Sequence, residues 1–475
     1  MEHQSDNTLK IHESCKIGPP CETELSSEPL TFFDVLWFKL HPSERLYFYS
    51  FPSHANSFFF DTLIPKLKRS LSLTLDHFLP LAGKVIWPSN SQKPFLLYTP
   101  GDGVSLVIAE TDADFNYLSG NGAREASELR PLVPSLDTTD SFASVIALQV
   151  TLFQNVGFCI GLSSHHAVLD GKSSTMFMKA WAHICRAGTQ EPPSLLPEEL
   201  HPFLDRTVIK DPNGLDIMYL NGWRFMSEAV GSHERSLKLL PSTTSPQCVN
   251  QMSLATFELN PNDLEKIKRR VISLWEKVHH EEEPVNLSTF VLASAFVFAC
   301  TAKAITGNEE SRNNNSTDIS FGFSVDCRSR LNPQVNPNYV GNCVFPCMIN
   351  IVAEDIVKEE GMVIMAKKLK SEIRRFLEKR SVLNEAEALI GKWKSMASNR
   401  TRGIALGGFY RFGVYKTDFG WGKPVKVEIA TVDTNGLVTM AETREGNGGI
   451  EFGLLLYKHE LDLFASSFRD AISGL

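Results

Sequence analysis

The stretch His165-His166-Ala-Val-Leu-Asp170-Gly171 is the most informative part of this chain, because it stands between a predicted hairpin and a predicted helix. Upstream, the apolar segments 145–153 and 157–164 alternate and are joined by a short turn, a pattern typical of a β-hairpin. Downstream, Ser173–Arg186 has apolar residues at helical spacing, with Ser173 or Ser174 as the N-cap. The two histidines are therefore expected where a buried strand ends in a turn, and such positions often carry catalytic groups.

The chemistry open to this stretch centres on His166, whose imidazole can act as a general base near neutral pH. Asp170 could orient that ring directly, as in a catalytic triad, or could point away and hold the turn through an arginine. No serine nucleophile is evident, since Gly161-Leu-Ser163-Ser-His165 lacks the second glycine of a nucleophile elbow. Direct transfer between two bound substrates is therefore predicted, with His165 as a structural residue.

A metal site is the alternative interpretation of the same residues. On a regular helix, His166 and Asp170 would share one face and could bind a metal together with His165. No further cluster of histidine, cysteine or acidic residues at a recognisable spacing completes a coordination shell. The sequence therefore predicts no metal.

Composition narrows the class of protein. The 475 residues suit two domains, and 43% apolar with 21% charged residues is ordinary for a globular protein. A net charge of -8 argues against nucleic acid as the main partner. The polar segment 1–20 has no secretory signal, the apolar run Phe290–Cys300 is too short for a bilayer, and the nine cysteines are scattered. We therefore expect a cytosolic protein with reduced thiols and no membrane partner.

Strand-like and helical patterns alternate in both halves of the chain, which predicts the α/β class. Residues 1–28 are interpreted as a loose N-terminal segment and 29–190 as a first domain. The proline-containing, weakly patterned stretch 191–250 is interpreted as a crossover linker. Residues 251–475 form a second domain, of which 401–425 are expected to tie back to the first.

Two further clusters carry unusual residues. Asp418-Phe419-Gly420-Trp421-Gly422 places two glycines around a tryptophan, which indicates a tight backbone path and, on its own, a turn with a packed ring. Arg328 and Arg330 leave a predicted strand end, where an arginine could pair with a buried carboxylate. For Arg330 we favour a solvated surface position.

Together these motifs resemble those of the plant BAHD acyl-CoA-dependent acyltransferases. That family is marked by His-x-x-x-Asp, matched by His166-Ala-Val-Leu-Asp170, and by Asp-Phe-Gly-Trp-Gly, matched by 418–422. Its anthocyanin-acyltransferase branch adds Tyr-Phe-Gly-Asn-Cys, and here Tyr339-Val340-Gly341-Asn342-Cys343 departs from it at Val340. Similarity covers nearly the whole chain, and 165–181 looks most like malonyltransferases that act on flavonoid and isoflavonoid glucosides.

The resemblance implies two chloramphenicol-acetyltransferase-like domains with mixed β-sheets flanked by helices, an active-site channel at their interface, and a monomer. It implies that Asp170 is turned from the channel and paired with an arginine, for which Arg328 is the candidate, with Asn342 supporting the same region. Asp418, Gly420, Trp421 and Gly422 would form an architectural turn between the domains. Trp421 is also considered as a residue that faces the channel and donates its N–H to the reaction's oxyanion.

The implied reaction transfers a malonyl group from malonyl-CoA to the 6-hydroxyl of a glucose on a flavonoid or other phenolic glucoside, with His166 as general base. Acyl-CoA is then a co-substrate, and no cofactor is bound. Hydroxycinnamoyl-CoA is the alternative donor, and a non-catalytic protein that binds phenolic glycosides is a more distant alternative. A hydrolase is disfavoured by the missing nucleophile.

Candidate substrate-binding residues remain less defined. Ser288 and Thr289 begin a predicted helix and could offer hydroxyl and N–H groups to the phosphates of CoA, or could form an ordinary N-cap. Asp34 is a further candidate for binding substrate or CoA. The malonyl carboxylate requires a cation such as an arginine, which the sequence does not identify.

Overall fold

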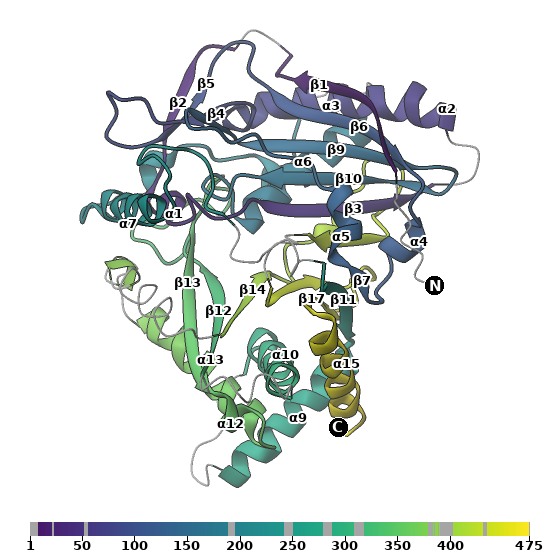
Figure 1. Cartoon of the computed structure of the whole chain (residues 1–475), viewed down its shortest axis with the longest axis vertical. Helices are drawn as coiled ribbons and strands as arrows, with labels where there is room; N and C mark the ends of the chain where they lie inside the picture. Colours follow the sequence, from purple (N-terminus) through teal and green to yellow (C-terminus); the bar gives the residue numbers. More distant parts are fainter. Residues whose placement is uncertain are drawn as a thin grey trace.

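The chain folds into two halves, each built around a mixed β-sheet with helices packed on it (Figure 1). The computed structural model describes residues 8–20, 23–51, 56–188, 195–241, 250–278, 287–307, 318–378, 383, 385–387, 389, 402–430 and 435–474. In the view of Figure 1 the N-terminal sheet (purple to blue) lies above the C-terminal sheet (green to yellow). The predicted α/β class and two-domain arrangement are confirmed.

The sheet of the N-terminal half carries the turn that contains His166. Its six strands run in the order β1 (Leu9–Ile17), β6 (Val104–Thr111), β9 (Ile146–Phe153), β10 (Gly157–Ser164), β3 (Ser43–Ser50) and β15 (Lys426–Ile429). The pair β6–β9 is parallel and the other pairs are antiparallel. Helices α3 (Ile64–His77) and α6 (Gly171–Ala187) pack against each other, with Trp181 Nε1 donating to the carbonyl of Leu67 at 3.2 Å. The central strands β9 and β10 are buried along their whole length.

The sheet of the C-terminal half has seven strands. They run in the order β13 (Val344–Val352), β12 (Asp318–Asp326), β14 (Arg402–Gly408), β16 (Leu437–Glu442), β17 (Ile450–Tyr457), β11 (Met252–Leu259) and β7 (Arg124–Glu125). The long helices described in this half are α9 (Pro261–Val278), α10 (Thr289–Thr306), α13 (Gly361–Glu378) and α15 (Lys458–Ser473). By length and composition α10 could cross a membrane, but 78% of it is buried inside the protein, as in the core helix of a globular domain.

A third, smaller sheet supports the N-terminal half. Its order is β2 (Ser26–Pro29), β5 (Phe95–Tyr98), β4 (Lys84–Ile86) and β8 (Phe142–Ser144). Near it, α1 (Phe32–Leu36) packs on α7 (Leu215–Ala229), and Trp223 Nε1 donates to the carbonyl of Val35 at 2.7 Å. The remaining short helical segments are α2 (Asn56–Phe58), α4 (Phe115–Leu118), α5 (Ala126–Leu129) and α12 (Ala353–Ile356), a π-helical turn at Phe59–Leu63, and 3-10 turns at Leu79–Ala82, Arg130–Leu132, Glu198–Leu200, Arg206–Val208 and Val414–Lys416.

The two halves exchange strands. The short strand β7 comes from the N-terminal half and pairs with β11, whereas β15 comes from the C-terminal half and pairs with β3. The tie was predicted for residues 401–425, but β14 within that range stays in the C-terminal sheet. Later in the same range, Tyr49 Oη of the N-terminal half donates to the Thr417 carbonyl at 2.8 Å, and β15 joins β3 directly after the range.

Three predictions are corrected. The N-terminal segment is not loose, because β1 pairs with β6 and β2 with β5; most of β1 is exposed, so its sequence is polar and shows no buried pattern. The predicted linker contains the 15-residue helix α7, while its residues 191–194 and 242–249 lie outside the described residues. Helix α6 begins earlier than predicted, with Asp170 as its N-cap in place of Ser173 or Ser174.

Candidate active site

The site is built on the turn that leads from strand β10 into helix α6. The strand ends at Ser164, and the Val168 N–H bonds back to the carbonyl of His165 at 2.9 Å. The Asp170 carboxylate then caps the helix, because its Oδ1 accepts from the Ser173 N–H at 2.8 Å. The end of the strand and the cap of the helix together fix the backbone conformation of the turn between them.

His166 is the half-buried residue of this turn, while its neighbours are buried. Its ring stacks on Trp37, with 4.6 Å between ring centroids and 13° between planes. The Nδ1 atom is enclosed and has no hydrogen-bond partner. Burial lowers the pKa of His166 below its usual 6.5, opposed first by the polar backbone of the residue itself and then by the charge of Asp170. The imidazole is therefore neutral at neutral pH. The stacking of Trp37, 129 positions earlier in the chain, has no local signal in the sequence.

Asp170 is buried and supports the backbone of the turn. Its side chain is 1% exposed, and its Oδ2 is 2.8 Å from Arg328 Nη2 and accepts from the Cys343 N–H at 3.2 Å. Arg328 Nη2 also donates to Ser173 Oγ at 3.1 Å and to the Tyr339 carbonyl at 3.0 Å. Because His166 Nδ1 has no partner, the triad arrangement is absent, and Asp170 instead holds the turn through Arg328.

A second buried ion pair supports the same turn. Asn342 Nδ2 donates to the carbonyl of His166 at 2.8 Å and to Asp34 Oδ1 at 3.1 Å. Arg206 Nη1 donates to Asp34 Oδ2 at 2.6 Å, and its Nη2 donates to the carbonyl of Val168 at 3.0 Å. Carbonyl groups on both sides of the turn are thus bound by side chains from distant segments.

Asp34, which we considered for substrate or CoA binding, is completely buried. Its carboxylate accepts hydrogen bonds from Arg206, from Asn342 and from the N–H and hydroxyl of Thr31. Thr31 is the N-cap of α1, so the carboxylate is also part of that helix cap. This position corrects the prediction, since a carboxylate so enclosed has no face for a substrate. The sequence did not suggest Arg206 as its partner, because the two residues are 172 positions apart and Arg206 lies in the stretch interpreted as a linker.

His165 is fully buried beside this network. Its Nδ1 accepts the N–H of Ala167 at 3.2 Å, and burial lowers its pKa to about 3. The side chain is therefore neutral at neutral pH and acts in the packing of the turn.

The segment Asp418–Gly422 forms a tight turn that contacts the N-terminal half. Gly420 and Gly422 have φ of +105° and +98°, which favours glycine, and Asp418 Oδ1 accepts both of their N–H groups at 2.8 and 2.9 Å. Asp418 also pairs with Arg186 of α6 at 3.2 Å. The turn therefore connects residues from both halves.

Trp421 packs against Phe158 and Phe58 and lies under the Lys66 ammonium, 5.1 Å from its ring. Phe158 is the second residue of β10, six residues before the strand ends at Ser164, which corresponds to about 20 Å along the strand. The suggestion that Trp421 faces the reacting groups and donates to an oxyanion is therefore wrong.

Ser288 is the N-cap of α10, and its Oγ accepts the Val291 N–H at 3.3 Å, while Thr289 is the first helical residue. This is the capping geometry expected of a serine before a helix. Contact of either residue with CoA stays a prediction.

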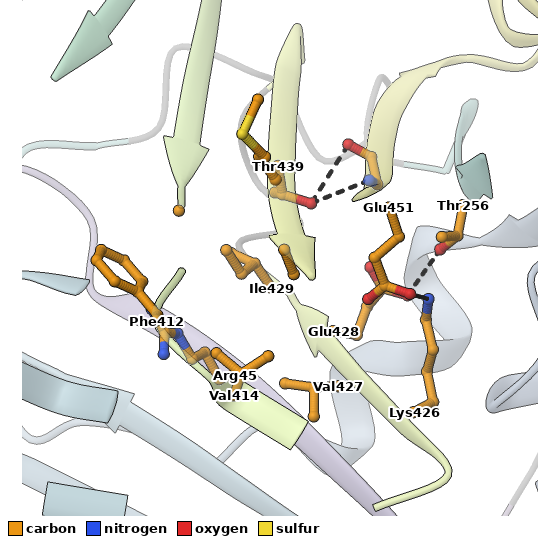
Figure 2. Close-up of a pocket in the computed structure, with 14 residues that line it drawn as sticks. Arg45, Thr256, Phe412, Val414, Lys426, Val427, Glu428, Ile429, Thr439 and Glu451 are labelled. Carbon is orange, nitrogen blue, oxygen red and sulfur yellow. Dashed lines mark hydrogen bonds and ion pairs between the residues drawn. The ribbon is translucent and has the colours of Figure 1, made fainter. Parts of the chain in front are cut away.

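A cavity lies between the sheets of the two halves and is shown in Figure 2. Its volume is about 20 Å³, which is room for about one water molecule. Arg45 and Phe412 lie together in the view, and the carboxylates of Glu428 and Glu451 gather elsewhere around it with Lys426. Lys426 Nζ is 3.2 Å from Glu451, and burial raises the pKa of Glu451 to about 7.

Arg45 links this cavity to the turn. Its Nη2 donates to the carbonyl of Gly171, the residue directly after Asp170, at 3.3 Å. A Cβ placed on Gly171 would meet Phe412 at 2.9 Å and Arg45 at 3.2 Å, so both side chains press against the start of α6.

The chain is similar in sequence to several known proteins. The model of the Transferase family matches residues 8–471. Phenolic glucoside malonyltransferase 1 of Arabidopsis thaliana is 39% identical over 484 residues and covers 100% of both chains. An anthocyanidin 5-O-glucoside-6''-O-malonyltransferase of the same plant is 39% identical over 98% of each chain. Agmatine coumaroyltransferase of Arabidopsis thaliana is 37% identical over 97% of this chain and 98% of its own.

Solved structures support the fold. Vinorine synthase superimposes with a TM-score of 0.68 at 18% identity and covers 96% of each chain. TRI101 of F. sporotrichioides, solved with coenzyme A and T-2, gives a TM-score of 0.61 at 16% identity over 93% of this chain and 97% of its own. At these identities the likeness concerns the architecture alone.

Proposed function

The chain belongs to the Transferase family, as a member of its BAHD acyl-CoA-dependent acyltransferases, and on this premise we propose that it malonylates the 6-hydroxyl of a glucose on a flavonoid or other phenolic glucoside. The observation that carries this proposal is the likeness, over the full chain, to malonyltransferases of phenolic and anthocyanidin glucosides. The half-buried neutral His166 at the end of β10 supplies the group that such a reaction needs.

In the proposed mechanism, His166 takes the proton of the acceptor hydroxyl through Nε2 while the hydroxyl oxygen attacks the thioester carbon of the donor. The tetrahedral intermediate then collapses, the carbon–sulfur bond breaks, and the protonated imidazole returns its proton to the CoA thiolate. A positioned base contributes on the order of 10²–10⁴ to the rate. The enclosed Nδ1 and the stacked Trp37 support this assignment, because they orient the ring with its other nitrogen away from the packing.

The buried network around Asp34, Asp170, Arg206, Arg328 and Asn342 has a positioning role in this mechanism. It binds the turn at the His166 carbonyl, at the Val168 carbonyl and at the Asp170 carboxylate. Attack on a bound thioester requires the base within hydrogen-bond reach of the hydroxyl, and small displacements are costly in rate. The network therefore fixes the position of His166, and His166 itself transfers the proton.

A hydroxycinnamoyl donor is the second candidate, favoured by the likeness to agmatine coumaroyltransferase. A direct test offers the purified protein malonyl-, p-coumaroyl- and acetyl-CoA in separate reactions, with a flavonoid 7-O-glucoside or agmatine as acceptor. Product mass and released thiol are measured together, and the flavonoid without its sugar is the matched control. We expect a malonyl ester on the glucoside and none on the control. A coumaroyl product formed in preference would contradict the donor assignment.

The pH dependence of the reaction tests the role of His166. The base works only when neutral, and burial lowers its pKa below 6.5, so the neutral form persists to more acidic pH than for an exposed histidine. We expect kcat/KM to be flat between about pH 8 and 6.5 and to fall only at lower pH. The measurement is kcat/KM with saturating acceptor, with circular dichroism at each pH to show that the protein stays folded. A decline centred above pH 6.5 would contradict the lowered pKa.

A further inference from the structure

The imidazolium that His166 forms in the proposed mechanism has no carboxylate as a counter-ion. The proton of the acceptor hydroxyl moves to Nε2, so the ring is positively charged until the CoA thiolate takes the proton. A catalytic triad balances such a charge with an aspartate on the other ring nitrogen. Here Nδ1 is enclosed without a partner, and no carboxylate in the described part of the chain bonds to the ring. Because an enclosed cation is costly, another group must stabilise this charge.

The charged groups near the turn are already engaged with other partners. Asp170 Oδ2 lies 2.8 Å from Arg328 Nη2, and Asp34 Oδ2 accepts from Arg206 Nη1 at 2.6 Å. The Lys39 ammonium donates to two backbone carbonyls. Each aspartate is thus neutralised by its own arginine, and neither is the counter-ion of the histidine.

The indole of Trp37 covers one face of the His166 ring. The two ring centroids are 4.6 Å apart, and the planes are nearly parallel, at 13°. A cation within about 6 Å of an aromatic centroid is attracted to the ring face, and tryptophan attracts it most strongly. Trp37 is itself partly buried, and the attraction grows where water is excluded. The indole is therefore placed to stabilise a positive charge on the imidazole.

The same buried network holds both rings of this stacked pair. Trp37 is the C-cap of α1, and the Asp34 carboxylate of that helix accepts from Asn342 Nδ2 at 3.1 Å. Asn342 Nδ2 also donates to the carbonyl of His166 at 2.8 Å. Trp223 Nε1 fixes α1 further by donating to one of its carbonyls at 2.7 Å. The distance between the rings is thus set before any substrate binds, as effective stabilisation of a developing charge requires.

Building on the proposed function, we propose that Trp37 stabilises the imidazolium of His166 through a cation–π interaction, in the role that a carboxylate has in a triad. The face of the indole attracts the charged ring more strongly than the neutral one, so the interaction favours the state after proton transfer. Trp37 acts through His166 and is therefore a positioning residue. Its contribution belongs to kcat and not to the binding of the donor.

The test replaces Trp37 in the full chain by tryptophan analogues that carry one to four fluorine atoms on the benzo ring. Fluorine withdraws electron density from the ring face but changes the shape of the ring little. We expect kcat for malonyl transfer to fall with each fluorine, by about 3- to 10-fold for four, while KM for malonyl-CoA stays constant. The matched control carries the same analogues at Trp421, whose ring lies 5.1 Å from the Lys66 ammonium and away from the turn. Its kcat should remain at the wild-type value.

The second readout is the pKa of His166, measured without substrates by NMR titration of ¹³C-labelled histidine. The signal is assigned by its absence from His166→Gln. Weaker attraction to the indole disfavours the charged ring, so the pKa should fall as fluorines are added, by about 1 for four. His165, the neighbour in the chain, has a pKa lowered to about 3 by burial and does not titrate in the same range. A purely structural role of Trp37 predicts no graded change, because the analogues keep its shape.

A constant kcat and a constant pKa across the fluorine series would overturn the proposal, as would a fall in kcat without a fall in the pKa. If the analogues prevent folding, Trp37→Phe and Trp37→Leu give the same comparison. The pKa of His166 should then be higher in Trp37→Phe, which keeps an aromatic face, and the reverse order would contradict the proposal. Failure of the proposed function is a separate result: the pKa would still fall with fluorination, but no malonyl ester would form on any glucoside.

Discussion

Replacement of His166 by alanine is expected to lower kcat for acyl transfer by about 10²–10⁴-fold while the protein remains folded. In the proposed mechanism no other group takes the proton of the acceptor hydroxyl, because Asp170 is bound to Arg328 and His165 is fully buried. The measurement is single-turnover transfer from malonyl-CoA, followed by thiol release and product mass. His166→Gln should lose activity to a similar degree, since an amide cannot accept the proton at neutral pH.

The matched control for this experiment is His201→Ala, which alters an exposed histidine outside the turn and is expected to leave kcat near its wild-type value. Turnover by His166→Ala at the wild-type rate would remove His166 from the mechanism and favour another base. Equal losses in His166→Ala and His201→Ala would indicate that the assay reports general damage to the protein.

Arg328→Met is expected to destabilise the protein by about 3–5 kcal/mol, because it leaves the buried Asp170 carboxylate without its counter-ion. The measurement is the free energy of unfolding from urea titration. Asp170 would keep only its hydrogen bonds from the N–H groups of Ser173 and Cys343. The double variant Asp170→Asn with Arg328→Met should lose less than the sum of its single changes, since both charges are then gone.

Arg186→Met is the control, at the far end of α6, the helix that Asp170 caps. Arg186 also pairs with an aspartate, Asp418, but its side chain is 66% exposed, and a surface pair of this kind contributes about 0–1 kcal/mol. If Arg328→Met proves no more costly than Arg186→Met, the Asp170–Arg328 pair is not the support of the turn that the geometry indicates.

Both predictions assume that the histidine and the aspartate of the His-x-x-x-Asp sequence have different roles. The histidine lies at the half-buried surface of the turn, whereas the aspartate four residues later caps α6 and joins Arg328 inside the protein. Asn342 and Arg206 bind backbone carbonyls of the same turn. Because the histidine and the aspartate act through different neighbours, loss of His166 should affect the rate alone. Loss of Arg328 should affect stability and, where it displaces the turn, the rate as well.

The spacing of apolar residues within single segments was sufficient to predict much of the fold. Strand β10 has the predicted bounds and β9 begins one residue later than predicted, since alternation with period two is a property of the segment itself. The place of His166 at a strand end followed from the same patterns. The N-cap at Asp170 was missed because serines that suit a cap stand just after it.

The sequence by itself thus determined the α/β class, the family motifs and the residue that we assign as the base. Only the tertiary structure decided which distant groups meet: Trp37 with His166, Arg206 with Asp34, and β15 with β3. It also moved Trp421 away from the turn. Periodicity records which face of a segment is buried, but pairing between segments depends on chain topology, which no local pattern contains.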